Sequence, residues 1–316
     1  MTKLSNANTA EDKLSFNNRL KSDMKRNYPL YILILPVLAY YIIFCYKPMY
    51  GAIIAFKDYQ PALGIFGSPW VGFKQFEKFF ENPDFFRILK NTLTISLSSI
   101  IFGFPAPIIL ALMFNELKLQ KFKSVAQTMS YLPYFISLVV VCGLIKTFVS
   151  QGGIVHQIVI LMGGKTVGLL SRPECFVPIY VLSDIWQGIG WGSIIYLAAL
   201  SAIDQELYEA ARIDGAGKWK RVIHITIPGI APTIIIMFIL RMGNLLTVGY
   251  EKIILLYNPL IYETSDVISS YTYRVGLEQQ DWSYSSAIGL LNSVINFFMI
   301  MATNKLSSTY SDTSLW

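Results

Sequence analysis

Residues 207–228 read LYEAARIDGAGKWKRVIHITIP, and long apolar runs stand on both sides of this segment. Asp204 and the acidic residues after it are typical of a helix start, and Gly215 and Gly217 are expected to end that helix. Alanine and glycine carry almost no side-chain bulk, so another backbone can approach the segment closely. The segment is too polar to cross a membrane and too regular for a random loop. It therefore predicts a short surface helix that docks onto a partner.

The apolar runs around this segment are long enough to cross a membrane. Hydrophobic residues make up 53% of the 316-residue chain and charged residues 15%, and the mean hydropathy is +0.47. Soluble domains carry about 25% charged residues, and a helix needs about 20 apolar residues to cross a bilayer. The sequence thus predicts an all-α integral membrane protein with six transmembrane helices. The expected spans cover about residues 29–50, 91–114, 125–149, 176–200, 231–256 and 284–303.

The same pattern divides the chain into three parts. A polar tail is expected at 1–27, a transmembrane domain at 28–305 with its docking loop at 201–230, and a second polar tail at 306–316. With the N-terminus inside, the inside segments hold 14 Lys and Arg residues and the outside loops hold nine. Because cytoplasmic loops carry the excess of basic residues, we expect a multi-pass protein with both termini in the cytoplasm.

Composition argues against several kinds of site. The chain has two histidines and three cysteines, and the cysteines lie in or beside apolar runs, so we expect no metal centre and no disulfide framework. No basic patch interleaved with aromatic residues indicates nucleic-acid binding. Residues 164–166 (GKT) resemble the end of a phosphate-binding loop, but Val159 occupies the required upstream glycine position. We therefore expect a turn there and no nucleotide site.

The docking loop carries a family motif. Residues 209–211 read EAA, Gly215 follows after three residues, and residues 225–228 read ITIP after nine more. This arrangement resembles the EAA loop of binding-protein-dependent ABC importer permeases, whose pattern ends in Ile-x-Leu-Pro. Ile227 in place of the leucine is the only departure. The position of the loop between the fourth and fifth of six spans is also that of the family.

The resemblance extends over about residues 28–305. Residues 70–73 (WVGF) and 91–92 (NT) look like maltose-type sugar permeases. Residues 249–252 (GYEK) and 256–259 (LYNP) resemble the oligosaccharide and polysaccharide subgroup, which is lipoprotein-permease-like. This subgroup implies a sugar substrate.

The resemblance also implies an architecture and a set of partners. It implies a type I ABC importer permease fold with a cytoplasmic coupling helix, in the cytoplasmic membrane of a bacterium. The subunit would be non-catalytic and without a cofactor of its own, since ATP and Mg²⁺ would bind to the partner ATPase. The implied partners are a second homologous permease, two ATPase subunits, an extracellular solute-binding protein, an oligosaccharide and membrane lipid. The residues assigned to ATPase docking are Glu209, Ala210, Ala211, Gly215 and Pro228.

Polar and aromatic residues inside two expected spans suggest a substrate path. Ionisable residues within a membrane usually face a cavity or a partner, and a sugar packs its C–H face on an aromatic ring while its hydroxyls meet polar groups. Gln187 and Trp191 are four residues apart in the fourth span. In the fifth span a continuous helix would place one further set on a single face, namely Arg241, Asn244, Val248 and Glu251. The alternative is that these residues join two permeases or pair internally, as Glu251 would with Lys252.

Other functions fit the sequence less well. A secondary transporter driven by an ion gradient would explain charged residues in the membrane but not the docking loop, and no inverted repeat of broken helices is evident. A channel would need a filter-like repeat, which the sequence lacks. An ABC importer permease for a non-sugar solute stays open, because the sugar assignment rests mainly on the resemblance. We expect the permease subunit of an ABC importer for an oligosaccharide or polysaccharide fragment.

Overall fold

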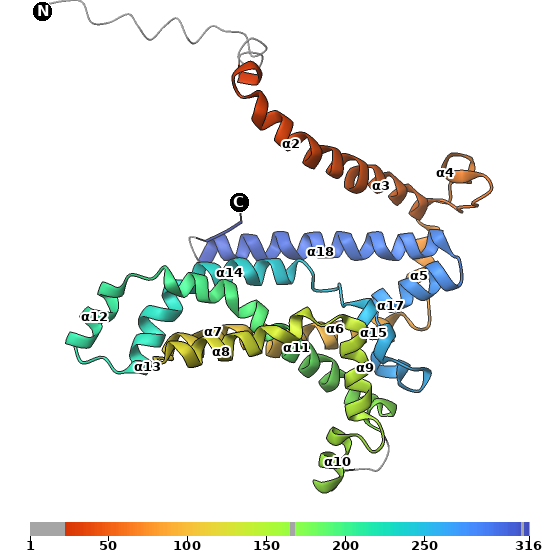
Figure 1. Ribbon diagram of the computed structural model, residues 1–316. Helices are drawn as coiled ribbons and strands as arrows, with labels where there is room; N and C mark the ends of the chain where they lie inside the picture. Colours follow the sequence, from red (N-terminus) through yellow and green to blue (C-terminus); the bar gives the residue numbers. More distant parts are fainter. Residues whose placement is uncertain (1–22, 165–167, 311–312, 316) are drawn as a thin grey trace, which may run out of the picture.

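The computed structural model describes residues 23–164, 168–310 and 313–315, and its secondary structure within these ranges is helical (Figure 1). The described residues contain no strand beyond an isolated antiparallel bridge between Lys57 and Trp70. The predicted all-α membrane fold is confirmed. Most of the expected N-terminal tail lies outside the described residues, as do Lys165, Thr166 and part of the C-terminal tail.

The helices follow one another with short connections. Their bounds, in chain order, are α2 (Tyr28–Tyr40), α3 (Lys47–Met49), α4 (Gly64–Gly67), α5 (Lys74–Phe80), α6 (Phe85–Ser98), α7 (Pro105–Glu116), α8 (Gln120–Tyr131), α9 (Leu138–Val149), α10 (Ile154–Leu161), α11 (Pro173–Ser201), α12 (Gln205–Ile213), α13 (Lys218–Arg221), α14 (Ile227–Met242), α15 (Tyr250–Leu256), α16 (Tyr262–Ser265), α17 (Ile268–Tyr273) and α18 (Trp282–Tyr310). Short π-helical turns join several neighbours in line, at Tyr41–Tyr46, Ser99–Gly103 and Val222–Thr226.

Several helical stretches are long and apolar enough to cross a membrane. Within the described ranges there are five of them, Tyr28–Phe56, Phe85–Glu116, Leu138–Leu161, Lys218–Met242 and Trp282–Thr309. Helices α11 and α12 add a sixth as a pair that bends by 70° between them. These stretches agree with the expectation of six spans.

The expected third span is not one continuous helix. Helix α8 ends at Tyr131, a tight turn over Leu132–Phe135 follows, and α9 begins only at Leu138. Pro133 lies in this turn, and a proline removes a backbone N–H and crowds the preceding helical turn. The chain therefore changes direction here, and α9 and α10 leave the line of α8 (Figure 1).

The expected continuous helix over 231–256 is also wrong. Helix α14 ends at Met242, and α15 begins at Tyr250. Gly243 and Gly249 stand at the two ends of the intervening stretch, and glycine is among the weakest helix formers. The break allows the residues after Met242 to point in directions that a straight helix would not permit.

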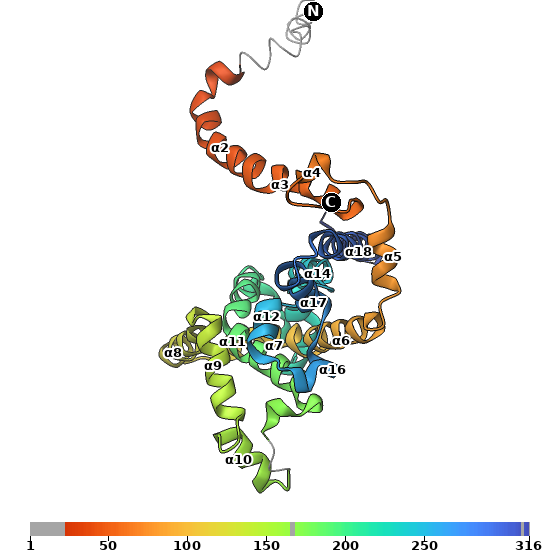
Figure 2. The ribbon, with the colours of Figure 1, turned by 90° about the vertical axis from the view of Figure 1, so that its right-hand side faces the viewer.

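The long helix α11 lies at the centre of the bundle. It packs beside α7, α8 and α14, and α18 lies along the other side of α14 (Figures 1 and 2). Near α12 the contact among α7, α11 and α14 is formed by Ala111, Tyr196, Leu200 and Ile230, all of which are buried. This apolar cluster fixes the ends of α11 and α14 from which the docking loop extends.

Close packing of α11 against α8 depends on one glycine. A β-carbon at Gly190 would overlap the backbone carbonyl of Ser130 in α8. At Gly188, two residues earlier in α11, a β-carbon would have nothing within 4 Å. The two glycines therefore differ in purpose, and only Gly190 lets two helix backbones touch.

Helix α2 stands apart from the rest of the molecule. It projects away from the bundle (Figures 1 and 2), and none of its residues is buried although it is strongly apolar. An apolar helix without protein neighbours is suited to lipid or to the helices of another subunit.

Candidate functional site

The helix expected to dock onto a partner is α12, which projects at one end of the bundle (Figure 1). The carboxylate of Asp204 accepts a hydrogen bond from the backbone N–H of Glu206 at 3.0 Å and caps the helix as its sequence predicts. Gly215 adopts a φ of 75°, a backbone conformation that favours glycine. The expected start and end of this helix are thus confirmed.

The motif residues form an open surface. Glu209 and Ala210 are exposed, Ala211 is half-buried, and Pro228 lies in the first turn of α14. Large apolar side chains beside them are exposed as well, with Ile213 88% and Trp219 80% accessible. An accessible set of small, acidic and apolar groups is the kind of surface that another protein covers.

The loop is braced against the bundle on its return. The hydroxyl groups of Tyr208 in α12 and Thr226 just before α14 lie 3.0 Å apart in a hydrogen bond, and Thr226 is buried. Helix α12 is therefore held both by its connection to α11 and by this contact near the start of α14.

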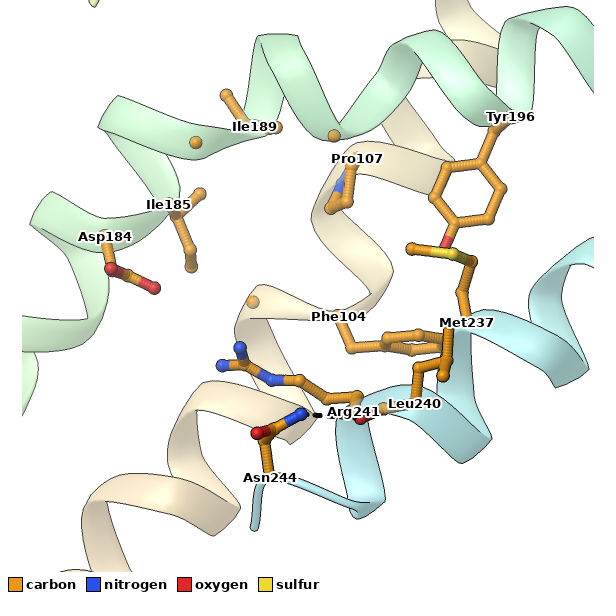
Figure 3. Close-up of a pocket in the computed structure, with 13 residues that line it drawn as sticks. Phe104, Pro107, Asp184, Ile185, Ile189, Tyr196, Met237, Leu240, Arg241 and Asn244 are labelled. Atoms are coloured by element: carbon orange, nitrogen blue, oxygen red, sulfur yellow. Dashed lines mark hydrogen bonds between the residues drawn. The ribbon is translucent and has the colours of Figure 1, made fainter. Parts of the chain in front are cut away.

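A cavity of about 410 Å³ lies among α7, α11 and α14 (Figure 3). Arg241 reaches it from the last turn of α14, Asn244 reaches it from just beyond that helix, and Asp184 reaches it from α11. Phe104 and Tyr196 supply aromatic wall. A second cavity of about 170 Å³ shares Asp184, Arg241 and Asn244 with the first. These three polar residues therefore lie where the two cavities adjoin.

The structure separates the residues expected to share one helical face. Arg241 and Asn244 line both cavities, whereas Val248 lines only the smaller one. Glu251 lines neither, because it lies in α15 beyond the break after Met242. The expectation of a single helical face is wrong, since no single helix carries all four residues.

Gln187 and Trp191 face the turn between α8 and α9. The indole of Trp191 stacks on Tyr134 with ring centroids 4.7 Å apart, and the Gln187 amide nitrogen donates to the Ile136 carbonyl at 3.4 Å. Neither residue lines the two cavities. The sequence identified the correct helix but could not show which of its faces the cavity lies on.

Lys252 pairs with Asp184 rather than with its neighbour Glu251. The ammonium group of Lys252 lies 3.4 Å from a carboxylate oxygen of Asp184 and donates to the Tyr180 carbonyl at 3.1 Å. It also lies 4.6 Å from the centroid of the Tyr180 ring. Lys252 is only 4% exposed and the Asp184 side chain is 48% exposed, so this ion pair joins the buried side of α15 to the open side of α11.

A buried ionic cluster that the sequence did not reveal lies at the end of the bundle away from α12. Asp266 is fully buried and accepts hydrogen bonds from both terminal nitrogens of Arg274, at 2.7 and 3.1 Å. Arg87 of α6 lies 3.5 Å from the same carboxylate, and the Asn91 amide donates to the Asp266 carbonyl. Burial alone would lower the pKa of the Arg274 guanidinium, but the hydrogen bonds and charge of Asp266 raise it overall. This cluster ties α6 to the segment before α18.

Comparison with known proteins identifies the family. Residues 84–309 match the family described as "Binding-protein-dependent transport system inner membrane component". The chain belongs to this family. It is thus a permease of an ABC importer, a multi-pass membrane subunit devoted to transport.

Individual relatives match almost the whole permease. Protein LplB of Bacillus subtilis (strain 168) is 42% identical over 294 residues, which are 93% of this chain and 92% of LplB. The polygalacturonan/rhamnogalacturonan transport system permease protein YteP of the same organism is 41% identical and covers 91% of this chain and 90% of its own. A chain of the crystal structure of a bacterial alginate ABC transporter, in complex with an alginate pentasaccharide-bound periplasmic protein, superposes with a TM-score of 0.86. It is 43% identical, and the match covers 94% of this permease and 100% of that chain.

Proposed function

We propose that this permease moves an oligosaccharide or polysaccharide fragment across the cytoplasmic membrane, driven by ATP hydrolysis in a partner ATPase. The observation that carries the proposal is the position of α12, which connects the two helices that hold Asp184 and Arg241 at the cavity. A substrate in the cavity and a partner on α12 would therefore act on the same helices. YteP is named for polygalacturonan and rhamnogalacturonan and the similar crystal structure for alginate, and these names support a sugar substrate.

The proposal includes a complete set of partners. A second homologous permease would cover the exposed apolar surface of α2 and complete the path. Two ATPase subunits, which bind ATP and Mg²⁺, would dock at α12 on the cytoplasmic side, where both termini would also lie. An extracellular solute-binding protein would deliver the sugar at the opposite end, and membrane lipid would surround the remaining apolar surface.

Individual docking residues have distinct proposed roles. Glu209 would pair with a basic group of the ATPase, and Ala210, Ala211 and Gly215 would let the ATPase backbone approach closely. Pro228 would begin the return of the chain into the membrane in α14. The exposure of Glu209 and Ala210 and the positive φ of Gly215 support this assignment.

Replacing Glu209 by lysine should separate the permease from its ATPase. Removing one partner of a desolvated ion pair costs about 2–5 kcal/mol in binding, and each 1.4 kcal/mol is about tenfold in affinity. We expect Glu209→Lys to lower the ATPase recovered with the tagged permease at least about tenfold. The measurement is quantitative co-purification from membranes in mild detergent.

The matched control is Glu278→Lys. Glu278 is exposed just before α18, at the end of the bundle away from α12. This variant makes the same change of charge on a surface that the proposal leaves free of ATPase, so its ATPase recovery should equal that of the unmodified chain. Full ATPase recovery and normal uptake with Glu209→Lys would refute the docking role.

A further inference from the structure

The charges around the membrane cavity do not balance. Asp184 and Arg241 line both cavities, and Lys252, which lines neither, pairs with Asp184 from α15, so the described residues bring two cations to one anion. The carboxylate of Asp184 is engaged by Lys252 at 3.4 Å. Arg241 has no hydrogen bond or ion pair to its guanidinium among the residues that the structure describes.

Lys252 is held too firmly to release Asp184 to Arg241. Its ammonium group is buried and is fixed by the Asp184 carboxylate, the Tyr180 carbonyl and the face of the Tyr180 ring. Moving Asp184 to Arg241 would leave a buried cation without its anion, which is strongly unfavourable. Among the described residues that line the cavity, the arrangement therefore leaves Arg241 as a cation without an anion.

Arg241 is positioned to meet a ligand. It stands in the last turn of α14, and Figure 3 shows its guanidinium directed from the helix into the space that faces Asp184 and Ile185. The neighbouring Asn244 uses its amide nitrogen on the Leu240 carbonyl at 3.1 Å, which leaves its side-chain oxygen as an acceptor beside the guanidinium. A free charge within a membrane segment is costly unless an anion or water reaches it.

The chemistry of Arg241 selects the kind of anion. A guanidinium presents parallel N–H donors that match the two oxygens of a carboxylate, and such bidentate pairs are stronger and more directional than bonds to neutral hydroxyl groups. The aromatic rings of Phe104 and Tyr196 lie in the same cavity and offer a surface for the C–H face of a sugar ring. Asn244 offers an acceptor for a hydroxyl group.

We propose that Arg241 binds the carboxylate of a uronic acid unit, so that this permease is built to pass acidic oligosaccharides rather than neutral ones. The proposal rests on the function proposed above and names the substrate class for the same cavity. Arg241 is then a specificity-determining residue, and Asp184 is kept from repelling the ligand by its pairing with Lys252.

The test is import by the complete transporter in proteoliposomes, with its second permease, ATPases and binding protein. The substrates are galacturonate and mannuronate oligomers, their methyl esters of equal length, and a neutral arabino-oligosaccharide. The esters keep the chain length and remove the charge. The variants are Arg241→Gln, which removes the cation, and Arg241→Lys, which keeps the cation but loses the paired donors. Lys146→Gln is the matched control, because Lys146 is an exposed cation of α9 outside the cavity.

A charge-assisted hydrogen bond contributes about 1.5–3 kcal/mol, so loss of Arg241 should lower the ratio of acid to ester import at least about tenfold. Arg241→Lys should give an intermediate ratio, and Lys146→Gln should leave the ratio unchanged. Recovery of the assembled complex from each variant shows that the comparison concerns intact transporters.

Four results would overturn the proposal. An unchanged acid-to-ester ratio in Arg241→Gln would show that Arg241 does not read the carboxylate. An equal loss for both forms would show instead that Arg241 pairs with the second permease or supports the fold. Import of neutral or esterified sugars alone by the unmodified transporter would refute the acidic class while leaving oligosaccharide import intact. If that transporter imported none of the sugars, the function proposed above would fail together with this inference.

Discussion

Asp266→Asn is expected to destabilise the permease by about 3 kcal/mol, the lower end of the range for breaking a buried ion pair. The substitution keeps the shape of the side chain but removes the charge that faces Arg274 and Arg87. Asp266 is fully buried, while the side chains of Arg274 and Arg87 are 18% and 29% exposed. Arg87 keeps its ion pair with Asp84 at 3.0 Å, and the partial exposure of Arg274 lessens the penalty of leaving that guanidinium unpaired. The check is the midpoint of thermal inactivation. It is measured as the fraction of detergent-solubilised permease that size-exclusion chromatography recovers after heating.

Asp281→Asn is the control for the loss of an aspartate charge. Asp281 pairs with Lys78 at 2.7 Å, but both side chains are solvent-accessible, at 34% and 54%. An exposed pair contributes less than about 1 kcal/mol, and asparagine can still accept the hydrogen bond from the Tyr284 N–H. If the two variants lowered the midpoint equally, the buried cluster would have no special part in stability.

Gly190→Ala should disrupt the packing of α11 on α8. The added methyl group would overlap the backbone of Ser130 and Tyr131, which cannot rotate away as a side chain can. Overpacking of this kind costs about 1–3 kcal/mol, and a backbone obstacle places it at the upper end. Separation of the helices should also disturb the stacking of Trp191 on Tyr134. The measurement is the inactivation midpoint together with the tryptophan fluorescence of the folded variant.

Gly188→Ala gives the matched comparison within the same helix. A β-carbon there meets nothing within 4 Å, so the change should leave the midpoint unchanged or raise it slightly through better helix propensity. Equal behaviour of the two variants would mean that α8 can yield at Ser130 without cost.

Helix α12 could be predicted from sequence because its signals are local. Asp204 caps the helix through the N–H of Glu206, two residues away, and Gly215 ends it through its own backbone conformation. The apolar runs likewise predicted the number of spans, since hydrophobic length follows from neighbouring residues alone.

The cavity was less accessible to sequence reasoning because it depends on where helices stop and how they face one another. The pattern from Arg241 to Glu251 fits one helix, yet Gly243 and Gly249 allow the chain to break between them. Lys252 has an acidic neighbour in sequence but takes Asp184, which is 68 positions away. The spacing of residues along the sequence does not predict an ion pair over such a separation.

The cluster around Asp266 was missed for the same reason. Asp266 and Arg274 stand in a connecting segment, and Arg87 and Asn91 lie nearly 180 positions earlier. The sequence shows Asp266 between serine-rich and apolar residues, but this pattern does not indicate which basic residues pair with it.

The attachment of α12 to both cavity walls has a mechanical consequence. Asp184 lies about 26 Å along α11 from its end at Ser201, and Arg241 lies about 21 Å along α14 from its start at Ile227, at about 1.5 Å per residue. The cavity ends of α11 and α14 carry Asp184 and Arg241, and their other ends are connected by the segment that contains α12. A tilt of about 10° applied there would move either residue by about 4 Å if the helices stay straight. That displacement exceeds the diameter of a water molecule, so under the proposed function a small rotation of α12 would be enough to tighten or release a sugar held in the cavity.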